Sequence, residues 1–283
     1  MRVPKTYKLY INGAFVRSEQ GRVLRQTDKK DRFVANYARA SRKDFRDAVT
    51  AARKAFAGWS KRTAFNRSQI VYRIAEMLDA RRAEFVDLLR THAGFSERKA
   101  QAEVDRALEA TMYYAGWADK YQQVLGSVNP VAAPYFNFSV PEPTGVVVVM
   151  ASPTSPLLGL LGAFLPALAA GNTVIAIFEN EAPTVGLSLA EVIATSDVPA
   201  GVVNLLAGQR EELVPHAASH MDVNAIVSIG AGASEREATA SAAADNVKRV
   251  LFLDDTWAGD AHLSLYRISP VVEVKTAWHP VGV

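Results

Sequence analysis

The stretch Pro166-Ala-Leu-Ala-Ala-Gly-Asn-Thr-Val174 decides the fold, because in it an apolar helix ends at a turn and an apolar strand begins at once. The turn is the pair Gly171-Asn172, and residues 156–178 around it are nearly all apolar. A membrane span needs about 20 uninterrupted apolar residues, but Pro166 and the turn divide this run. The stretch therefore predicts a buried helix followed by a buried strand, and no membrane span.

The same alternation of strand and helix continues from Gly145 to about residue 253. Its strands are short, unbroken runs of Val, Ile and Leu, which is typical of strands covered by helices on both faces. Alternation of this kind predicts an α/β fold with a doubly wound, Rossmann-like parallel sheet. The expected strands are 146–150, 173–178, 202–206, 225–229 and 249–253, with helices at about 157–170, 184–195, 211–219 and 234–243.

The first third of the chain reads as a hairpin followed by helices. Residues 8–16 surround Asn12-Gly13, a strong hairpin turn signal. Ser41 and Asp44 have the spacing of a capping box, and apolar residues then recur at helical intervals. The expected helices begin at Ser41 and run from about Ala64 to His92 and from about Ser96 to Val124.

The composition excludes some functions and leaves one question open. The 283 residues are 49% hydrophobic and 22% charged, the balance of a soluble globular protein. There is no Cys, so disulfides, thiolate metal sites and cysteine nucleophiles are excluded. Residues 1–100 hold 24 Lys and Arg against 10 Asp and Glu, which leaves 8 against 19 for residues 101–283. Either the two parts attract each other, or the basic part binds an anionic partner such as nucleic acid.

One turn has the position of a phosphate-binding loop. Gly230-Ala-Gly232-Ala-Ser-Glu235 follows an expected strand and opens an expected helix. The third glycine position holds Glu235, whose carboxylate would stabilise the helix start and repel a pyrophosphate. A structural turn is therefore favoured over a phosphate site. No His and carboxylate residues have metal-ligand spacing, so no metal is expected.

Several stretches, in order along the chain, resemble the aldehyde dehydrogenase family. The segment from Pro166 to Val174 is similar to a family signature, and Gly208 resembles the turn after the third strand of the nucleotide domain. Other similar stretches are Tyr10-Ile-Asn-Gly13, Pro143-Thr-Gly-Val-Val147, Val198-Pro-Ala-Gly-Val-Val-Asn204 and Glu273-Val-Lys-Thr276. The resemblance implies a hairpin and helices of the coenzyme domain (1–126), oligomerisation strands (127–143), a Rossmann-like nucleotide-binding domain (144–262) and a C-terminal oligomerisation strand (263–283).

The resemblance also implies that the functional residues of the family are missing. The ribose-binding Lys falls at Ile177 and its Glu partner at Asn180, while residues 153–156 lack the oxyanion-hole Asn. The general-base Glu should follow Val250, but the chain reads Leu251-Phe-Leu-Asp-Asp-Thr256. About twenty residues then stand where full-length members have the catalytic domain with its nucleophilic Cys. We therefore expect no catalytic residue, and only a remnant of the cofactor site at Gly208, Gly230 and Gly232.

Two segments with period-two alternation match the small antiparallel oligomerisation sheet of the family. Residues 135–140 and 271–278 are each expected to be a strand with one buried face. Left open, such strands would aggregate, so their retention indicates assembly, and deletion of 270–283 is expected to abolish it. The expected interface residues are Phe136, Phe138, Val140, Val272, Val274 and Trp278.

The leading hypothesis is a non-catalytic, cytoplasmic aldehyde dehydrogenase-like subunit. It would assemble with itself or with a full-length aldehyde dehydrogenase, and it would bind no cofactor, or NAD only weakly. One alternative is an NAD(P)-dependent aldehyde oxidoreductase with residual or altered activity. A second alternative is an anion-binding or nucleic-acid-binding protein that uses the basic first third, although no nucleic-acid motif accompanies it.

Overall fold

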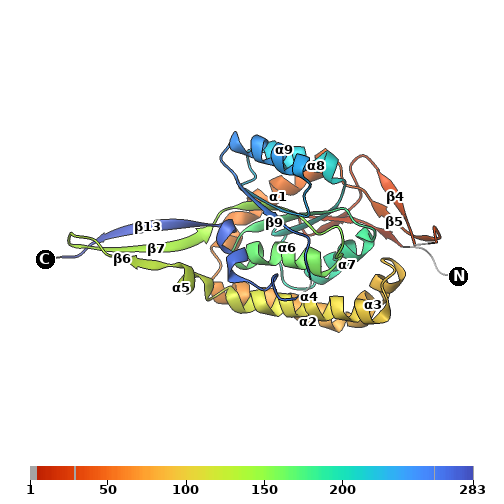
Figure 1. Ribbon diagram of the computed structural model, residues 1–283, viewed down its shortest axis with the longest axis horizontal. Coiled ribbons are helices and arrows are strands. Elements are labelled where there is room, and N and C mark those ends of the chain that lie inside the picture. The colour runs from red at the N-terminus through yellow and green to blue at the C-terminus, as the bar shows by residue number, and fades with distance from the viewer. Residues whose placement is uncertain (1–4, 29, 258, 283) are drawn as a thin grey trace.

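The computed structural model describes residues 5–28, 30–257 and 259–282, and these form one body with a long arm (Figure 1). A seven-stranded sheet, with strand order β12-β11-β8-β9-β10-β2-β3, lies at the centre of the body. Strands β8 to β12 run parallel and are covered on both faces, which confirms the doubly wound sheet. The strands of this sheet are β2 (Leu9–Ile11), β3 (Ala14–Val16), β8 (Val146–Met150), β9 (Thr173–Phe178), β10 (Val203–Ala207), β11 (Ala225–Ile229) and β12 (Arg249–Leu253).

The helices lie close to their expected positions, with two corrections. The expected helix 64–92 divides at Arg81, whose backbone leaves helical geometry at φ −108° and ψ 14°. The expected helix 96–124 divides after Trp117. The α-helices of the described residues are α1 (Arg42–Ser60), α2 (Ala64–Ala80), α3 (Arg82–Thr91), α4 (Glu97–Trp117), α5 (Tyr121–Leu125), α6 (Leu158–Ala169), α7 (Pro183–Ala194), α8 (Arg210–Ser219) and α9 (Ala233–Ala244).

The first third contains strands that the sequence pattern does not reveal. Strands β1 (Thr6–Tyr7), β4 (Val23–Thr27) and β5 (Phe33–Ala38) form a small sheet of order β1-β5-β4. The turn between β4 and β5 is held by the Asp28 carboxylate, which accepts the backbone N–H groups of Lys30 and Arg32 at 2.9 Å. The expectation that everything after the hairpin is helical is therefore wrong, because these strands are short and mix polar with apolar residues.

The stretch from Pro166 to Val174 forms the expected helix, turn and strand, but Pro166 lies inside α6 and does not end it. The helix ends at Gly171, whose φ of +97° favours glycine. The N–H of Gly171 donates to Leu168 O and the N–H of Asn172 to Ala167 O, each at 3.0 Å, which is the Schellman pattern.

The Asn172 side chain joins three parts of the body. Its Oδ1 accepts the N–H of Gly145, just before β8, at 2.8 Å. Its Nδ2 donates to Ala167 O in α6 at 3.1 Å and to Val271 O, just before the arm, at 2.9 Å. Asn172 is fully buried and makes all three contacts from one side chain, although Ala167 O also accepts the backbone N–H of Asn172 and Val271 O that of Thr144.

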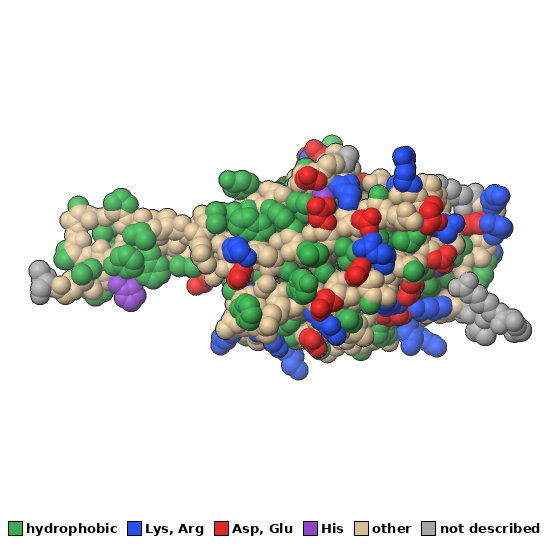
Figure 2. Space-filling model, turned by 90° about the horizontal axis from the view of Figure 1, so that it is seen from below, with side chains coloured by type: hydrophobic (Ala, Val, Ile, Leu, Met, Phe, Trp, Pro, Cys, Tyr) green, Lys and Arg blue, Asp and Glu red, His purple; other side chains and the backbone are tan. Residues whose placement is uncertain are grey.

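Three antiparallel strands form the arm, which projects from the body (Figures 1 and 2). They are β6 (Ser127–Asn129), β7 (Tyr135–Pro143) and β13 (Val272–Pro280), in the order β13-β7-β6. The two strands expected at 135–140 and 271–278 are thus confirmed in place, and β7 is longer than expected. A small antiparallel sheet accompanies the large one, as the resemblance implies.

The arm differs from expectation in where its apolar residues lie. Register pairs Trp278 with Asn137 and His279 with Phe136. Because directly paired residues share a face, the arm carries apolar side chains on two faces. One face holds Val128, Phe136, Phe138, Val140, Ala277 and His279, and the other holds Tyr135, Pro141, Val272, Val274 and Trp278.

Neither face is covered within the single chain. Phe136 is 49% exposed, Val274 63% and Trp278 59%. Phe138 and Val140 are half-buried, and of the expected interface residues Val272 alone is buried, against the body. The expectation that each strand buries one face therefore fails for the isolated chain. Within β7 the buried residues are Asn137, which is polar, and Pro141.

Among the described residues no helix is long and apolar enough to cross a membrane. The most apolar helix, α6, has 12 residues.

The triple role of Asn172 leads to a stability prediction. Asn172→Ala removes the partner of the Gly145 N–H and one of the donors to each of the Ala167 and Val271 carbonyls, so the free energy of unfolding should fall by about 2 kcal/mol. Gln101→Ala, an exposed position on α4, is the control and should change it by less than about 0.5 kcal/mol. Urea unfolding followed by circular dichroism measures both, and equal effects would contradict the role of Asn172.

Candidate functional site

In doubly wound sheets, ligands bind in the crevice at the carboxyl ends of the strands. Here that crevice is bordered by the segments that follow β8, β9, β10, β11 and β12. These segments begin with Ala151, Glu179, Gly208, Gly230 and Asp254. All three glycines of the expected cofactor remnant, Gly208, Gly230 and Gly232, lie in or beside it.

An internal ion pair in the crevice joins the segment after β10 to the segment after β11. The Arg210 guanidinium donates to the Glu235 carboxylate at 2.6 Å and to Ser228 Oγ at 2.7 Å, and Ser228 donates to Glu235 at 2.9 Å. Arg210 also reaches Ala151 O, at the end of β8, at 3.3 Å. Because Glu235 lies in the first turn of α9, its carboxylate is placed where a helix N-terminus would bind an anion.

The glycines of the expected remnant have separate structural reasons. Gly230 has φ +68°, which a glycine adopts at no steric cost. A Cβ on Gly208 would lie 2.5 Å from Leu213 Cδ1, so this position is tight against α8. Gly232 is the N-cap residue of α9, and a Cβ there would meet open space. None of the three needs a ligand to explain it.

A second hydrogen-bonded cluster closes the crevice between β8 and β12. The Asp255 carboxylate accepts from Ser152 Oγ at 2.5 Å, from Thr154 Oγ1 at 2.6 Å and from Trp257 Nε1 at 2.6 Å. Ser155, in the same loop after β8, donates its hydroxyl to Glu103 at 2.6 Å. The hydroxyl groups of this loop are thus used to hold the loop itself.

Helix α4 pins the connection that follows β12. Arg106 donates to the carbonyls of Trp257 and Gly259, and the Tyr114 hydroxyl donates to His262 O at 2.6 Å. His262 is buried, and burial, assisted by Arg106, lowers its pKa, which favours the neutral ring at neutral pH. Burial also raises the pKa of the Tyr114 hydroxyl, which therefore stays protonated as a donor.

Sequence reasoning missed Glu103, Arg106, Arg210 and Asp255. Their hydrogen-bond partners are distant in the sequence, so no local motif predicts these contacts. The one available signal is at Leu251-Phe-Leu-Asp-Asp-Thr256, where acidic residues directly follow a buried strand.

The two positions at which the family's ribose anchors were expected are occupied differently. Ile177 is fully buried within β9. Asn180 accepts the backbone N–H of Ala182 through its Oδ1 at 2.9 Å, which shapes the turn before α7. Both side chains serve the local fold.

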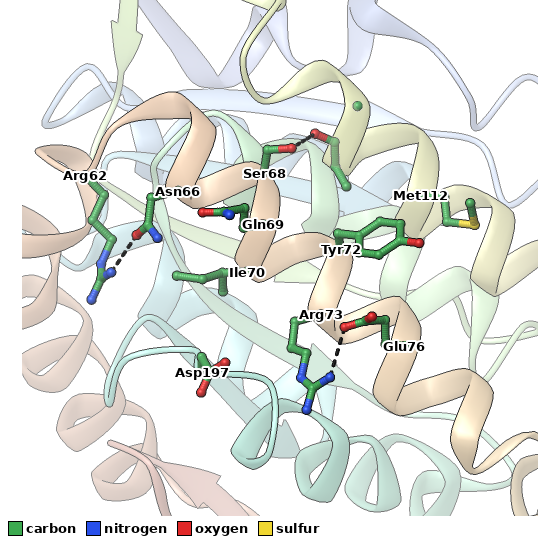
Figure 3. Close-up of a pocket in the computed structure, with 12 residues that line it drawn as sticks. Arg62, Asn66, Ser68, Gln69, Ile70, Tyr72, Arg73, Glu76, Met112 and Asp197 are labelled. Carbon is green, nitrogen blue, oxygen red and sulfur yellow. Dashed lines mark hydrogen bonds and ion pairs between the residues drawn. The ribbon is translucent and has the colours of Figure 1, made fainter.

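Two of the hollows can be compared with the crevice. One is a cavity of about 570 Å³ between α8 and α9, which the crevice residues Glu179, Arg210 and Glu235 line in part. The other, of about 890 Å³, is a groove between α2 and α4 near Asp197, which precedes β10 at the opposite end of the sheet (Figure 3). In this groove Arg73 pairs with Glu76 on the same helix and Arg62 donates to Asn66, so its arginines are occupied locally. No group of three or more His, Asp or Glu residues in the described part of the chain could hold a metal ion.

Ion pairs connect the basic first part of the sequence with the acidic remainder. Basic residues of the first hundred positions pair with acidic residues of the remainder, which supports attraction between the two parts over a basic surface for an anionic partner. These pairs are Lys5–Glu191, Arg81–Glu191, Arg22–Glu212, Arg39–Glu212, Arg53–Asp222 and Arg82–Asp105.

Comparison with known proteins places the chain beside aldehyde dehydrogenases. The pattern that defines the aldehyde dehydrogenase family matches residues 15–253. D-glyceraldehyde dehydrogenase (NADP(+)) of Thermoplasma acidophilum is 28% identical over 87% of this chain and 50% of its own length. Cytosolic aldehyde dehydrogenase 1 of Elephantulus edwardii is 31% identical over 86% and 49%. The chain thus spans about half the length of the curated relatives it matches.

Solved structures of aldehyde dehydrogenases are also similar to this chain. Betaine aldehyde dehydrogenase from Staphylococcus aureus, a point mutant in complex with NAD+, has a TM-score of 0.81 at 25% identity, over 87% of this chain and 49% of that one. The NAD+ complex of an aldehyde dehydrogenase from Bacillus cereus has a TM-score of 0.83 at 26% identity, over 88% and 51%.

The Asp255 cluster can be tested against its neighbour in the sequence. Asp255→Ala removes the acceptor of three donors and should lower the free energy of unfolding by about 2 kcal/mol. Asp254→Ala is the matched control, because that side chain is 83% exposed and its ion pair with Arg236 should contribute less than about 1 kcal/mol. The midpoints of urea unfolding decide between them; similar losses for both variants would refute the cluster.

Proposed function

Because the chain belongs to the aldehyde dehydrogenase family, we propose that it is a non-catalytic subunit that assembles through its arm with itself or with a full-length aldehyde dehydrogenase. One contrast carries the proposal: polar side chains of the crevice bond to one another, whereas the arm leaves apolar faces open. The reaction of the full-length relatives is not assigned to this chain, which covers about half of their length.

The chemistry implied by the resemblance lacks its reacting groups here. That chemistry needs a thiolate nucleophile, donors for an oxyanion and a general base. The chain has no Cys. The hydroxyls of Thr154 and Ser155 already donate to Asp255 and Glu103, and Asp255 already accepts three hydrogen bonds. The hydrogen-bonding groups of these side chains are thus already used within the fold.

The crevice residues also do not fit a dinucleotide. A pyrophosphate would accept backbone N–H groups at a helix N-terminus, but the first turn of α9 holds the Glu235 carboxylate. At α8, the backbone N–H of Arg210 already donates to Glu179 at 2.7 Å. Ile177, at the expected ribose anchor, is buried in the sheet. These contacts favour weak or absent NAD binding, and they give no support to residual NAD(P)-dependent activity.

The arm supplies a reason for assembly. Its two apolar faces lie on opposite sides of a single sheet, so a partner that covers one face leaves the other exposed. On the face of Trp278, a polar row links Asn129, Asn137, Ser139 and Thr276 by hydrogen bonds of 2.6 to 2.9 Å. The outer edge of β13 has no neighbouring strand within the described chain, and such an edge is a template for pairing.

The contacts of β13 refine the deletion expected from the sequence. Val271 O accepts from Asn172, and Val272 is buried against the body. Removing residues 270–283 would therefore damage the body as well as the arm. A deletion that begins at Glu273 separates the two effects.

We predict that the isolated chain shows no NAD-dependent aldehyde oxidation, because it has no thiol nucleophile. The assay follows NADH absorbance with short aliphatic and aromatic aldehydes, using protein free of host dehydrogenases. Turnover above that of a heat-denatured sample would contradict the proposal.

NAD binding should be limited by the charge at the start of α9. Glu235→Gln removes one negative charge from the anion position and should strengthen NAD+ binding by about tenfold. Glu237→Gln, an exposed position on the same helix, should leave the affinity unchanged. Calorimetry at millimolar NAD+ measures all three chains, and a low-micromolar Kd for the unaltered chain would refute the limit.

The two faces of the arm should act separately in assembly. Phe136→Glu and Trp278→Glu each place a charge on one face, so each should lower the mass of the oligomer, and the double variant should be monomeric. Tyr266→Glu, at a body residue that is 76% exposed, should leave the mass unchanged. Size-exclusion chromatography with light scattering reports the mass; a monomeric parent, or variants that keep its mass, would overturn the assembly role.

A further inference from the structure

We propose that two copies of this chain pair through the outer edges of their β13 strands, antiparallel and symmetric about Thr276, so that two three-stranded arms form one continuous sheet. This pairing rests on the assembly role proposed above, and it names a second copy as the partner. Strand β13 is the edge strand of the arm and has nine residues (Figure 1). An edge of this length is a template for another strand.

The backbone groups of β13 that face outward lie on alternate residues. The N–H of Val281 donates to Pro134 O at 2.9 Å in a pair that continues the register of β13 with β7. Odd-numbered residues therefore bond to β7, and the even-numbered residues from 272 to 280 turn their backbone groups outward. The prolines of β7 fit this alternation, because Pro141 and Pro143, which have no N–H, lie opposite even-numbered residues.

One register pairs two copies of β13 along their whole length. Strands Val272–Pro280 related by a two-fold axis overlap completely only when the middle residue, Thr276, lies opposite its own copy. Thr276 has outward backbone groups, so its N–H and C=O would each bond to the partner's Thr276. A shift of one residue instead places Lys275 opposite its own copy, and like charges directly opposite destabilise a sheet.

The side chains complement one another in this register. Val274 lies opposite the partner's Trp278, and both residues are largely exposed in the single chain. Aromatic and β-branched residues that lie opposite each other stabilise a sheet. On the other face, Glu273 lies opposite the partner's His279, whose imidazole can donate to a carboxylate. Lys275 lies opposite the partner's Ala277, so no like charges meet.

A row of hydroxyl groups across the arm favours a second copy over an unrelated strand. Ser127 on β6 lies opposite Ser139 on β7, which in turn lies opposite Thr276. The Ser139 and Thr276 hydroxyls are hydrogen-bonded at 2.8 Å. In the single chain this row stops at the outer edge. The partner's Thr276 would continue it, because threonines opposite each other can form a hydrogen bond.

Single cysteines test the register directly, because the chain has no Cys of its own. Each residue from Val274 to Trp278 is replaced in turn, and the variants are oxidised at equal concentration. Thr276→Cys should form a disulfide-linked dimer about tenfold faster than the others, since opposite residues have Cα atoms about 5.5 Å apart, within disulfide reach. In this register Lys275→Cys and Ala277→Cys place each thiol about 8 Å from its own copy, which is beyond that reach.

Non-reducing electrophoresis measures the rates of cross-linking. A maximum at another position, or a rate for Thr276→Cys no higher than that for Tyr266→Cys on the exposed body surface, would overturn the pairing. Light scattering of the unaltered chain separates this result from the assembly role. An oligomer whose Thr276→Cys variant does not cross-link refutes the edge pairing alone, whereas a monomer refutes both.

A proline variant tests the backbone contact. Thr276→Pro removes an outward N–H, and an edge strand tolerates proline when the missing N–H faces solvent, so the arm should stay folded while the Kd of the dimer rises about tenfold or more. Thr276→Val, which keeps the N–H, should raise it less. Light scattering across a dilution series measures the Kd, and hydrogen exchange of β7 checks the arm. A dimer of unchanged Kd in Thr276→Pro would contradict the pairing.

Discussion

Hydrogen bonds from α4 hold the connection between β12 and β13 against the body, and the distinctive features of the chain depend on them. Arg106 and Tyr114 donate hydrogen bonds to backbone carbonyls of this connection. Trp257 is thereby buried beside α6 and donates to Asp255, which in turn fixes the loop after β8. The same connection leads through Val271 to the arm, where Asn172 anchors it. The segment between β12 and β13 thus both contacts the loop after β8 and positions the start of the arm.

Predicting this structure from sequence succeeds where burial alone sets the pattern. Four of the five parallel strands, β8 to β11, are fully buried, so their unbroken apolar runs identify them, and the edge strand β12 is only half-buried. The faces of the arm depend on which residue of β13 lies opposite which residue of β7, and a period-two pattern in either strand leaves that register undetermined. The hydrogen bonds within the crevice could not be predicted either, because the partners of Arg210 and Asp255 are distant in the sequence. The position of Glu235 at the expected helix start did indicate that its carboxylate would repel a phosphate.

The arm and the crevice differ in how their side chains are paired or covered. In the crevice, Arg210 is paired with Glu235, and Asp255 with Ser152, Thr154 and Trp257, within the chain. On the arm, large apolar residues on two faces meet water, a state that assembly relieves and that aggregation would also relieve. Membership in the aldehyde dehydrogenase family supplies the fold, while the chain's own contacts argue for a use of that fold without the family's chemistry.

Hydrogen exchange of the unaltered chain, followed by mass spectrometry across a range of protein concentrations, tests this account most directly. If the arm is an assembly surface, the backbone amides of β13 and β7 become more protected as concentration rises, while those of β8 to β12 stay strongly protected throughout. Arm amides that exchange at the same fast rate at every concentration, and also in the presence of a full-length aldehyde dehydrogenase, would contradict it.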